Sequence, residues 1–423
     1  MLSRRQLLRG AVVTVAGAAL PAVLAACGGT SSTATATTGT SAGTSSTSTT
    51  AASTSAATSA ATTAASTPMA AATTAAATPS TSASPVAVDM GTLGNPSKAV
   101  TLVETGSSLL YPLFNAWAPA IHQQYSNITV QTASTGSGTG IAQAVAGVAQ
   151  FGGTDAYMSD AQLKTAPPMA NIPLCISAQQ VNYNVPEVTT PLKLSGPILA
   201  AIYQGTIKYW DDAQIASANS GVTLPHQAII PVHRTDGSGD TFIFTQYLSF
   251  STPDWQTKVG FGTSVNFPGV AGALGAVGNP GVLQTVSQTK YSLGYIGSSF
   301  LNQAQAKGLG TALLLNKAGN YVPIQTANIT AAASAMVPQT PKDERISLIF
   351  APGADSYPII NYEYVAVQTK QSDPDIAQSM RTVLAWAIST DGGNASSFLD
   401  PVHFLPLPSS VLPLSQAQIA AIQ

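Results

Sequence analysis

One pattern occurs four times between residues 99 and 245: a short apolar segment, then a turn of small and polar residues, then a segment with helical spacing. The apolar segments are residues 99–103, 128–132, 151–155 and 228–232. Strands that alternate with helices favour parallel α/β sheets. We therefore expect the turns to lie at the carboxyl edge of a sheet, which is where ligands bind in open α/β folds.

The fourth turn has the composition of an anion site. It runs from Arg234 through Asp236, Ser238 and Gly239 to Asp240, and a helical segment follows. Backbone N–H groups at a helix N-terminus point toward a ligand, and glycine allows a close approach to the main chain. The planar donors of arginine match a tetrahedral oxyanion. An ordinary polar β-turn is the alternative, so the interpretation depends on the other turns.

The three earlier turns supply further donors and one carboxylate. The first contains Ser108 and Leu109, the second contains Ser137, and the third strand ends in Asp155. Because the carboxyl ends of parallel strands share one edge, we expect these groups to lie together. For Asp155, a helix N-cap or a surface turn is the alternative.

Composition excludes some classes of partner. The chain has 423 residues, enough for two ordinary domains, and only 8% of them are charged, against roughly 25% in typical soluble proteins. The formal net charge is −2, and removal of a leader containing Arg4, Arg5 and Arg9 would make it −5. A net-acidic chain without a basic run argues against nucleic acid as a partner. An anion would have to be attracted by a focused site rather than by the field of the whole protein.

The N-terminus resembles a bacterial lipoprotein signal over residues 1–27. A twin arginine precedes an apolar stretch, residues 11–23, that is too short for a permanent membrane span. The small residues before Cys27 look like a lipobox, which implies cleavage before Cys27 and its acylation; an ordinary cleaved signal is the alternative. Export by the twin-arginine or the general secretory route stays open. Residues 28–97, rich in Ala, Ser and Thr, are predicted to be a disordered tether, for which O-glycosylation is an option.

The two cysteines provide no disulfide framework, because lipidation of Cys27 leaves Cys175 without a partner. The fold must then depend on its apolar core. Cys175 lies in an apolar run, residues 172–176, and is expected to be a buried small hydrophobe rather than a reactive thiol.

Four stretches in series, residues 151–159, 207–212, 233–245 and 293–296, resemble the substrate-binding component of the high-affinity phosphate ABC transporter. The resemblance extends from about Val100 to the C-terminus. It implies a two-lobed periplasmic binding protein fold of type II, in which two α/β domains joined by a two-crossing hinge close on phosphate. We expect one lobe at residues 98–183 and 352–423 and the other at residues 184–351.

The resemblance also implies a phosphate-binding site that contains no metal, no cofactor and no catalytic residue. Asp236 would orient Arg234, and the family usually has Thr-Phe where this chain has Ser108 and Leu109. The implied phosphate-binding residues are Ser108, Leu109, Ser137, Asp155, Arg234, Ser238, Gly239 and Asp240.

Two of these residues, Asp155 and Asp240, are carboxylates, which would ordinarily repel an anion. Near neutral pH phosphate still carries a proton that Asp155 can accept, whereas sulfate is fully ionised and would be repelled. Asp240 replaces a threonine that is common in the family. Its side chain could turn away and cap the following helix, which we favour, or accept a second ligand proton, or indicate a more protonated oxyanion.

We therefore expect an extracytoplasmic lipoprotein, anchored to the membrane through Cys27, that delivers phosphate as a monomer to a permease and its ATPase. A receptor for sulfate or molybdate, a phosphatase-like enzyme and a surface adhesion lipoprotein are the alternatives. An enzyme is disfavoured because none of the four histidines lies in a nucleophile elbow or at metal-ligand spacing.

Overall fold

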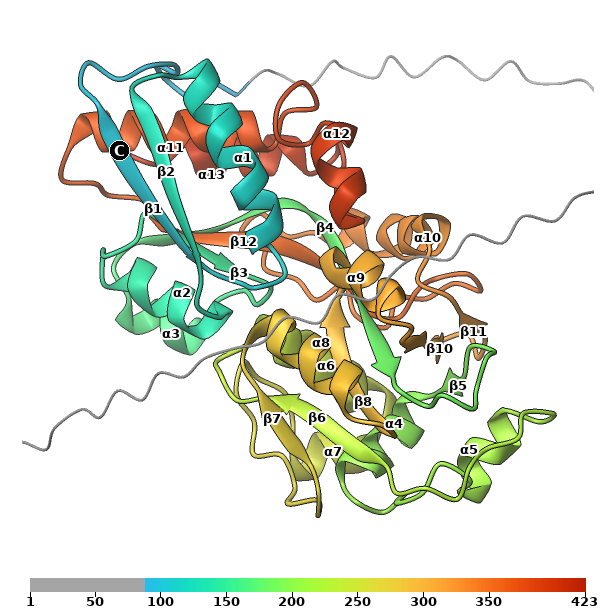
Figure 1. Cartoon of the computed structure of the whole chain (residues 1–423). Helices are drawn as coiled ribbons and strands as arrows, with labels where there is room; N and C mark the ends of the chain where they lie inside the picture. Colours follow the sequence, from blue (N-terminus) through green and yellow to red (C-terminus); the bar gives the residue numbers. More distant parts are fainter. Residues whose placement is uncertain (1–87) are drawn as a thin grey trace, which may run out of the picture. The chain divides into compact units, whose positions relative to one another are not determined.

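A long mixed β-sheet runs through the folded part of the chain (Figure 1). Its main path has the strand order β2-β1-β3-β12-β4-β8-β6-β7, while β9 and β13 pair with β4 beside this path, and a separate sheet has the order β11-β10-β5. The strands are β1 (Val100–Gly106), β2 (Ile128–Ser134), β3 (Phe151–Thr154), β4 (Met169–Tyr183), β5 (Lys193–Leu194), β6 (Ile230–Arg234), β7 (Leu274–Ala276), β8 (Ser292–Gly297), β9 (Gly310–Thr311), β10 (Leu313–Leu315), β11 (Tyr321–Val322), β12 (Ile360–Gln368) and β13 (Leu405–Pro406).

Helices follow most of the strands, as the spacing of apolar residues predicts. The α-helices are α1 (Tyr111–Gln124), α2 (Ser137–Val145), α3 (Asp160–Thr165), α4 (Gly196–Tyr203), α5 (Ala213–Ala218), α6 (Gly239–Ser251), α7 (Pro253–Lys258), α8 (Gly278–Gln288), α9 (Leu301–Ala306), α10 (Thr326–Met336), α11 (Pro374–Ala387), α12 (Ser396–Leu399) and α13 (Leu412–Ala420). Short 3-10 turns cover Ser298–Phe300, Val337–Gln339 and Asp400–Val402.

The computed structural model describes residues 88–423. The predicted signal peptide, Cys27 and most of the predicted tether lie outside the described residues. The last residues assigned to the tether from the sequence make contacts: the backbone N–H of Gly94 donates to Thr382 of α11 at 3.0 Å, and Ser97 donates to Asp375. These contacts hold residues 94–97 against α11.

The prediction of parallel sheets is correct for part of the pairing only. β1 pairs in parallel with β2 and β3, and β6 pairs in parallel with β7 and β8. The pairs β3–β12, β12–β4 and β4–β8 are antiparallel. The antiparallel strands are the ones by which the chain passes between two halves of the sheet: β4 pairs with β12 through Ala178 and with β8 from Gln179.

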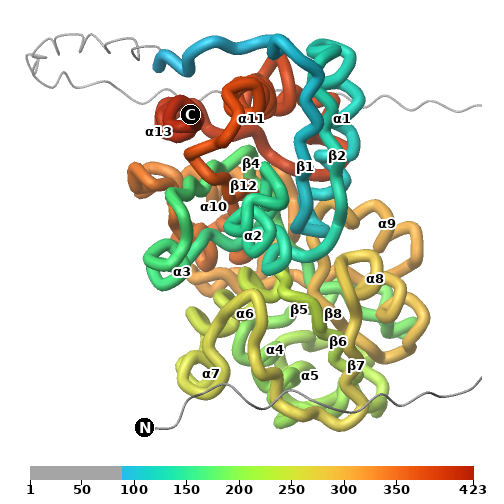
Figure 2. The backbone as a smooth tube through the Cα atoms, turned by 90° about the vertical axis from the view of Figure 1, so that its left-hand side faces the viewer, coloured from blue at the N-terminus to red at the C-terminus, as the bar shows by residue number. Residues whose placement is uncertain are grey.

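This change of partner along β4 defines two lobes. The first lobe contains β1, β2, β3, β12 and the first part of β4, and the second contains β6, β7, β8 and the end of β4 (Figure 2). In the first lobe, α1 and α2 cover opposite faces of the sheet, because their buried residues belong to different apolar clusters. α1 contributes Leu113, Phe114, Trp117 and Ile121, at helical spacing, to the large cluster.

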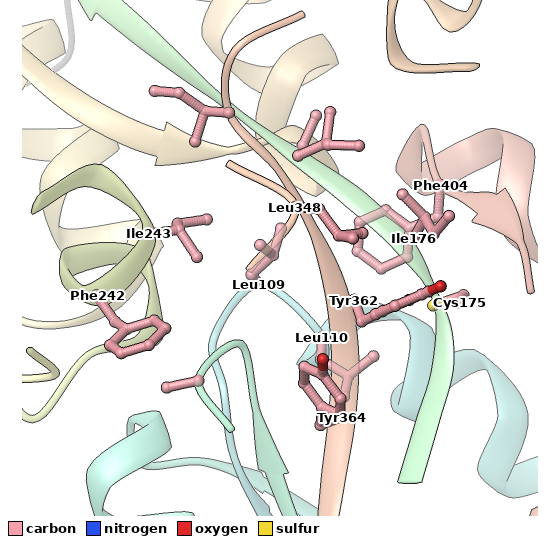
Figure 3. Packing of buried hydrophobic residues seen from close by; sticks show 14 of the residues in the cluster. Leu109, Leu110, Cys175, Ile176, Phe242, Ile243, Leu348, Tyr362, Tyr364 and Phe404 are labelled. Carbon is pink, nitrogen blue, oxygen red and sulfur yellow. The ribbon is translucent and has the colours of Figure 1, made fainter. Parts of the chain in front are cut away.

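The large apolar cluster extends from the first lobe into α6 of the second. In the view of Figure 3, Leu109 and Leu348 lie between Ile243 of α6 and Ile176 of β4. Cys175 belongs to this cluster and is fully buried with a free thiol, which confirms its predicted packing role. No helix among residues 88–423 is both long and apolar enough to cross a membrane.

Candidate functional site

The two lobes meet through the turns that follow β1, β2, β3 and β6. The backbone N–H of Gly138, in the second turn, donates to the carbonyl of Gly237, in the fourth, at 2.8 Å. A Cβ atom on Gly239 would lie 2.2 Å from Asp155 Oδ2 and 2.5 Å from Ser137 Oγ. Only glycine permits this approach, so the start of α6 faces Asp155 and Ser137 directly.

The first turn contributes two serines with different partners. Ser107 Oγ accepts from the backbone N–H groups of Leu109 and Leu110, at 3.1 and 3.2 Å, and donates to Asp155 Oδ1. Ser108 Oγ accepts from Asn279 at the start of α8, both from its backbone N–H and from its side-chain Nδ2, each at 3.0 Å. The predicted residues Ser108 and Leu109 are therefore buried at this junction, and Ser107 joins them.

Asp155 follows β3 and is fully buried. Its carbonyl accepts from Asn361 Nδ2 at 2.5 Å, and its backbone N–H donates to Ser137 Oγ at 3.4 Å. Carboxylate oxygen Oδ2 has no hydrogen-bond partner among the described residues, although it is buried. Burial, followed by the charge of Asp240, raises the pKa of Asp155 to about 7. The site therefore holds a buried acceptor with one uncommitted oxygen.

Arg234 ends β6 and lies buried between two carboxylates. Its Nε and Nη2 atoms donate to the two oxygens of Asp236, at 2.7 and 2.5 Å, and its Nη1 atom donates to Asp240 Oδ2 at 2.9 Å. Burial alone would lower the pKa of Arg234, but Asp236 and Asp240 raise it, so the guanidinium stays charged. Asp236 thus orients Arg234, as the resemblance implies.

The expectation that Asp240 turns away to cap α6 is wrong. The cap is Ser238, whose Oγ atom accepts from the backbone N–H of Thr241 at 3.1 Å. Asp240 is fully buried, and besides Arg234 it accepts from Asn279 Nδ2 at 2.7 Å and from Gln179 Nε2 at 3.0 Å. Burial raises the pKa of Asp240, and these donors act against that shift.

The structure brings in residues that the sequence did not indicate: Ser107, Gln179, Asn279, Asn361 and Glu363. Three of them lie on β4 and β12, where polar residues interrupt otherwise apolar segments. Polar residues inside an apolar strand indicate a role in such a site, because a buried polar group needs a hydrogen-bond partner. The prediction that the four turns assemble is correct, and their partners come from the strands that pass between the lobes.

The histidines lie elsewhere. His226 stacks on Tyr209 and bonds Asp211 on the surface, His233 packs against Phe267, His122 contacts the carbonyl of Ile128, and His403 contacts Asn302. Within residues 88–423 no group of three His, Cys, Asp or Glu side chains is placed to hold a metal ion. The site is thus a set of hydrogen-bond donors around a buried carboxylate.

Comparisons with known proteins agree with this architecture. The PBP superfamily domain matches residues 91–391. The phosphate-binding protein PstS of Pasteurella multocida (strain Pm70) is 35% identical over 333 residues, which is 78% of this chain and 93% of the relative. The protein of that name from Methanocaldococcus jannaschii is 33% identical over 337 residues, covering 74% of this chain and 83% of the relative.

Solved structures confirm the two-lobed α/β fold. A high-affinity periplasmic phosphate-binding protein (PfluDING) with bound phosphate has a TM-score of 0.60 at 21% identity, over 76% of this chain and 93% of its own. A phosphate-binding protein from Stenotrophomonas maltophilia has a TM-score of 0.57 at 18% identity, over the same shares. The chain therefore belongs to the PBP superfamily and, within it, to the PstS family of substrate-binding transport proteins, which are not enzymes.

Proposed function

We propose that this chain captures inorganic phosphate between its two lobes and delivers it to the permease and ATPase of an ABC transporter. The observation that carries the proposal is Asp155 Oδ2, a buried acceptor without a partner among the described residues, which faces the N-terminus of α6. A helix N-terminus favours an anion, and the buried acceptor favours an anion that still carries a proton. Phosphate near neutral pH meets both conditions.

The proposed binding residues are the ones inferred from the turns. The hydroxyls of Ser108, Ser137 and Ser238 and the guanidinium of Arg234 act as donors, together with the backbone N–H groups of Gly239 and Asp240. The backbone N–H of Leu109 would be shared between the ligand and Ser107 Oγ. Each buried oxygen left without a donor would cost about 1–3 kcal/mol, so a nearly complete set of donors is needed. Asp155 accepts the ligand proton.

Asp240 serves this site mainly through Arg234. Its carboxylate already accepts from Arg234, Asn279 and Gln179, which favours a fixed, charged partner over an acceptor for a second ligand proton. This arrangement supports phosphate over a more protonated oxyanion. Sulfate remains the relevant competitor, because it shares the charge and shape of phosphate but carries no proton.

Titration calorimetry tests the proposed phosphate binding. The protein used is residues 80–423, which form one compact unit. We expect tight binding of phosphate and of arsenate, which also carries a proton near neutral pH, and no detectable binding of sulfate. Absence of phosphate binding, or equal binding of sulfate, would contradict the proposal.

We further propose that the two lobes, residues 98–183 with 352–423 and residues 184–351, close on the ligand, and that Cys27 carries a lipid anchor on the extracytoplasmic side of the membrane. The sequence around Cys27 supports the anchor. Metabolic labelling with a fatty-acid probe tests it: the wild type should be labelled and membrane-bound, whereas Cys27→Ser should be unlabelled and released. Equal labelling of both proteins would refute the anchor.

A further inference from the structure

A second buried carboxyl, that of Glu363, is a neighbour of the Asp155 carboxyl. β3 and β12 pair antiparallel with Thr154 opposite Tyr364, so Asp155, the residue that follows β3, continues this register toward Glu363. Residues opposite one another on paired strands point to the same face of a sheet. Glu363 is fully buried, as is Asp155.

The fixed partners of Glu363 leave one of its oxygens uncommitted. Oε1 accepts from Ser177 Oγ of β4 at 2.5 Å, and Oε2 has no partner among the described residues. Asp155 Oδ2 is uncommitted in the same sense. Two adjacent buried carboxyls cannot both be ionised without a large cost, so one of them holds a proton.

Neighbouring charges decide which of the two carboxyls holds the proton. Burial and the charge of Asp240 raise the pKa of Asp155 to about 7. The hydrogen bonds with Glu363 and Ser107 and the charge of Arg234 act against that shift and favour its ionised form. Burial, followed by the charges of Asp155 and Asp240, raises the pKa of Glu363 well above its usual value. On β4, Cys175 lies opposite Glu363 and is fully buried. The groups that act on Glu363 are carboxylates and the hydroxyl of Ser177, with no cation among them, which favours the neutral acid.

We propose that Glu363 is a positioning residue for selectivity: in its neutral form it donates a hydrogen bond to Asp155 and keeps Asp155 ionised as the acceptor for a ligand oxygen that carries a proton. This inference rests on the proposed binding of phosphate. Without the donor, Asp155 would itself become protonated at a higher pH. A protonated Asp155 donates, and it can then bind fully ionised sulfate. Glu363 therefore sets the pH below which the site stops excluding sulfate.

Two substitutions separate this role from packing. Glu363→Gln keeps a donor toward Asp155 and an acceptor for Ser177, so its affinity ratio of phosphate to sulfate should follow the wild type between about pH 5 and pH 9. Glu363→Leu removes the donor at similar volume. Its loss of selectivity on acidification should begin about one pH unit higher than in the wild type. Glu344→Gln, at a buried carboxyl held by Ser415 and Gln418, is the matched control and should leave the profile unchanged.

Infrared difference spectroscopy at neutral pH tests whether Glu363 holds a proton, and this test does not depend on phosphate binding. The wild type minus Glu363→Gln spectrum should contain the C=O stretching band of one protonated carboxylic acid. Absence of that band would overturn the proposal, as would a tenfold loss of phosphate affinity in folded Glu363→Gln, or an unshifted profile in folded Glu363→Leu. If the band is present but neither protein binds phosphate, the proposed function fails and the position of the proton stands.

Discussion

Arg234 Nη1 donates to Asp240 Oδ2 at 2.9 Å, and both side chains are almost fully withdrawn from solvent. The same guanidinium forms a two-pronged pair with Asp236, so Arg234 is held between two carboxylates. A donor that is fixed in advance loses little entropy on binding. Its position depends on Asp240, a residue that looked from the sequence like a departure from the family pattern.

Substitution of Asp240 should therefore affect stability as well as binding. Asp240→Ala leaves Arg234 Nη1 and the side chains of Asn279 and Gln179 without their acceptor. Breaking a buried ion pair from one side costs about 3–5 kcal/mol, and urea unfolding should show a loss of that order. Asp254→Ala removes the exposed pair with Lys258 and should leave the unfolding midpoint unchanged. Equal stability of Asp240→Ala and the wild type would contradict this account.

The sequence predicted the four turns because each depends on residues close together in the chain. Ser238, for example, caps α6 through a contact three residues away, with Thr241. Asp240 was misassigned because its partners Gln179 and Asn279 lie on other elements, 61 and 39 residues away. The same limit applies to Glu363, which meets Asp155 only through the antiparallel pairing of β12 with β3. Strict alternation of strands and helices predicts parallel sheets, and it carries no sign that β4 and β12 pass between two lobes.

Substitution of Gly239 should weaken binding. Its absent Cβ atom would lie 2.2 Å from Asp155 Oδ2, so Gly239→Ala is expected to hinder the approach of the two lobes. Overpacking of this kind costs about 1–3 kcal/mol, which corresponds to a roughly 5- to 150-fold loss of phosphate affinity by calorimetry. Gly269→Ala is the control, because nothing lies within 4 Å of its added Cβ. Normal affinity in Gly239→Ala would refute the proposed close approach.

Stability should fall as pH rises because of Glu104 on β1. Burial raises the pKa of this carboxyl to about 8 from a usual value of 4.5. The folded state then binds the proton more tightly, so its stabilising contribution is complete below about pH 4.5 and is lost as pH rises toward 8. Glu104→Gln can still accept from Thr132 and should reduce the slope of unfolding free energy by up to about 1.4 kcal/mol per pH unit. Urea unfolding across this range measures the slope, and an unchanged slope would contradict the assignment.

The central claim is that Asp155 accepts a proton carried by the ligand, and parallel calorimetric titration of the wild type and Asp155→Asn with phosphate and sulfate tests it most directly. The wild type should bind phosphate and show no heat with sulfate. Asparagine offers a donor in place of the carboxylate, so Asp155→Asn should bind sulfate and lose most of its preference for phosphate. If folded Asp155→Asn excludes sulfate as well as the wild type does, the role assigned to Asp155 is wrong.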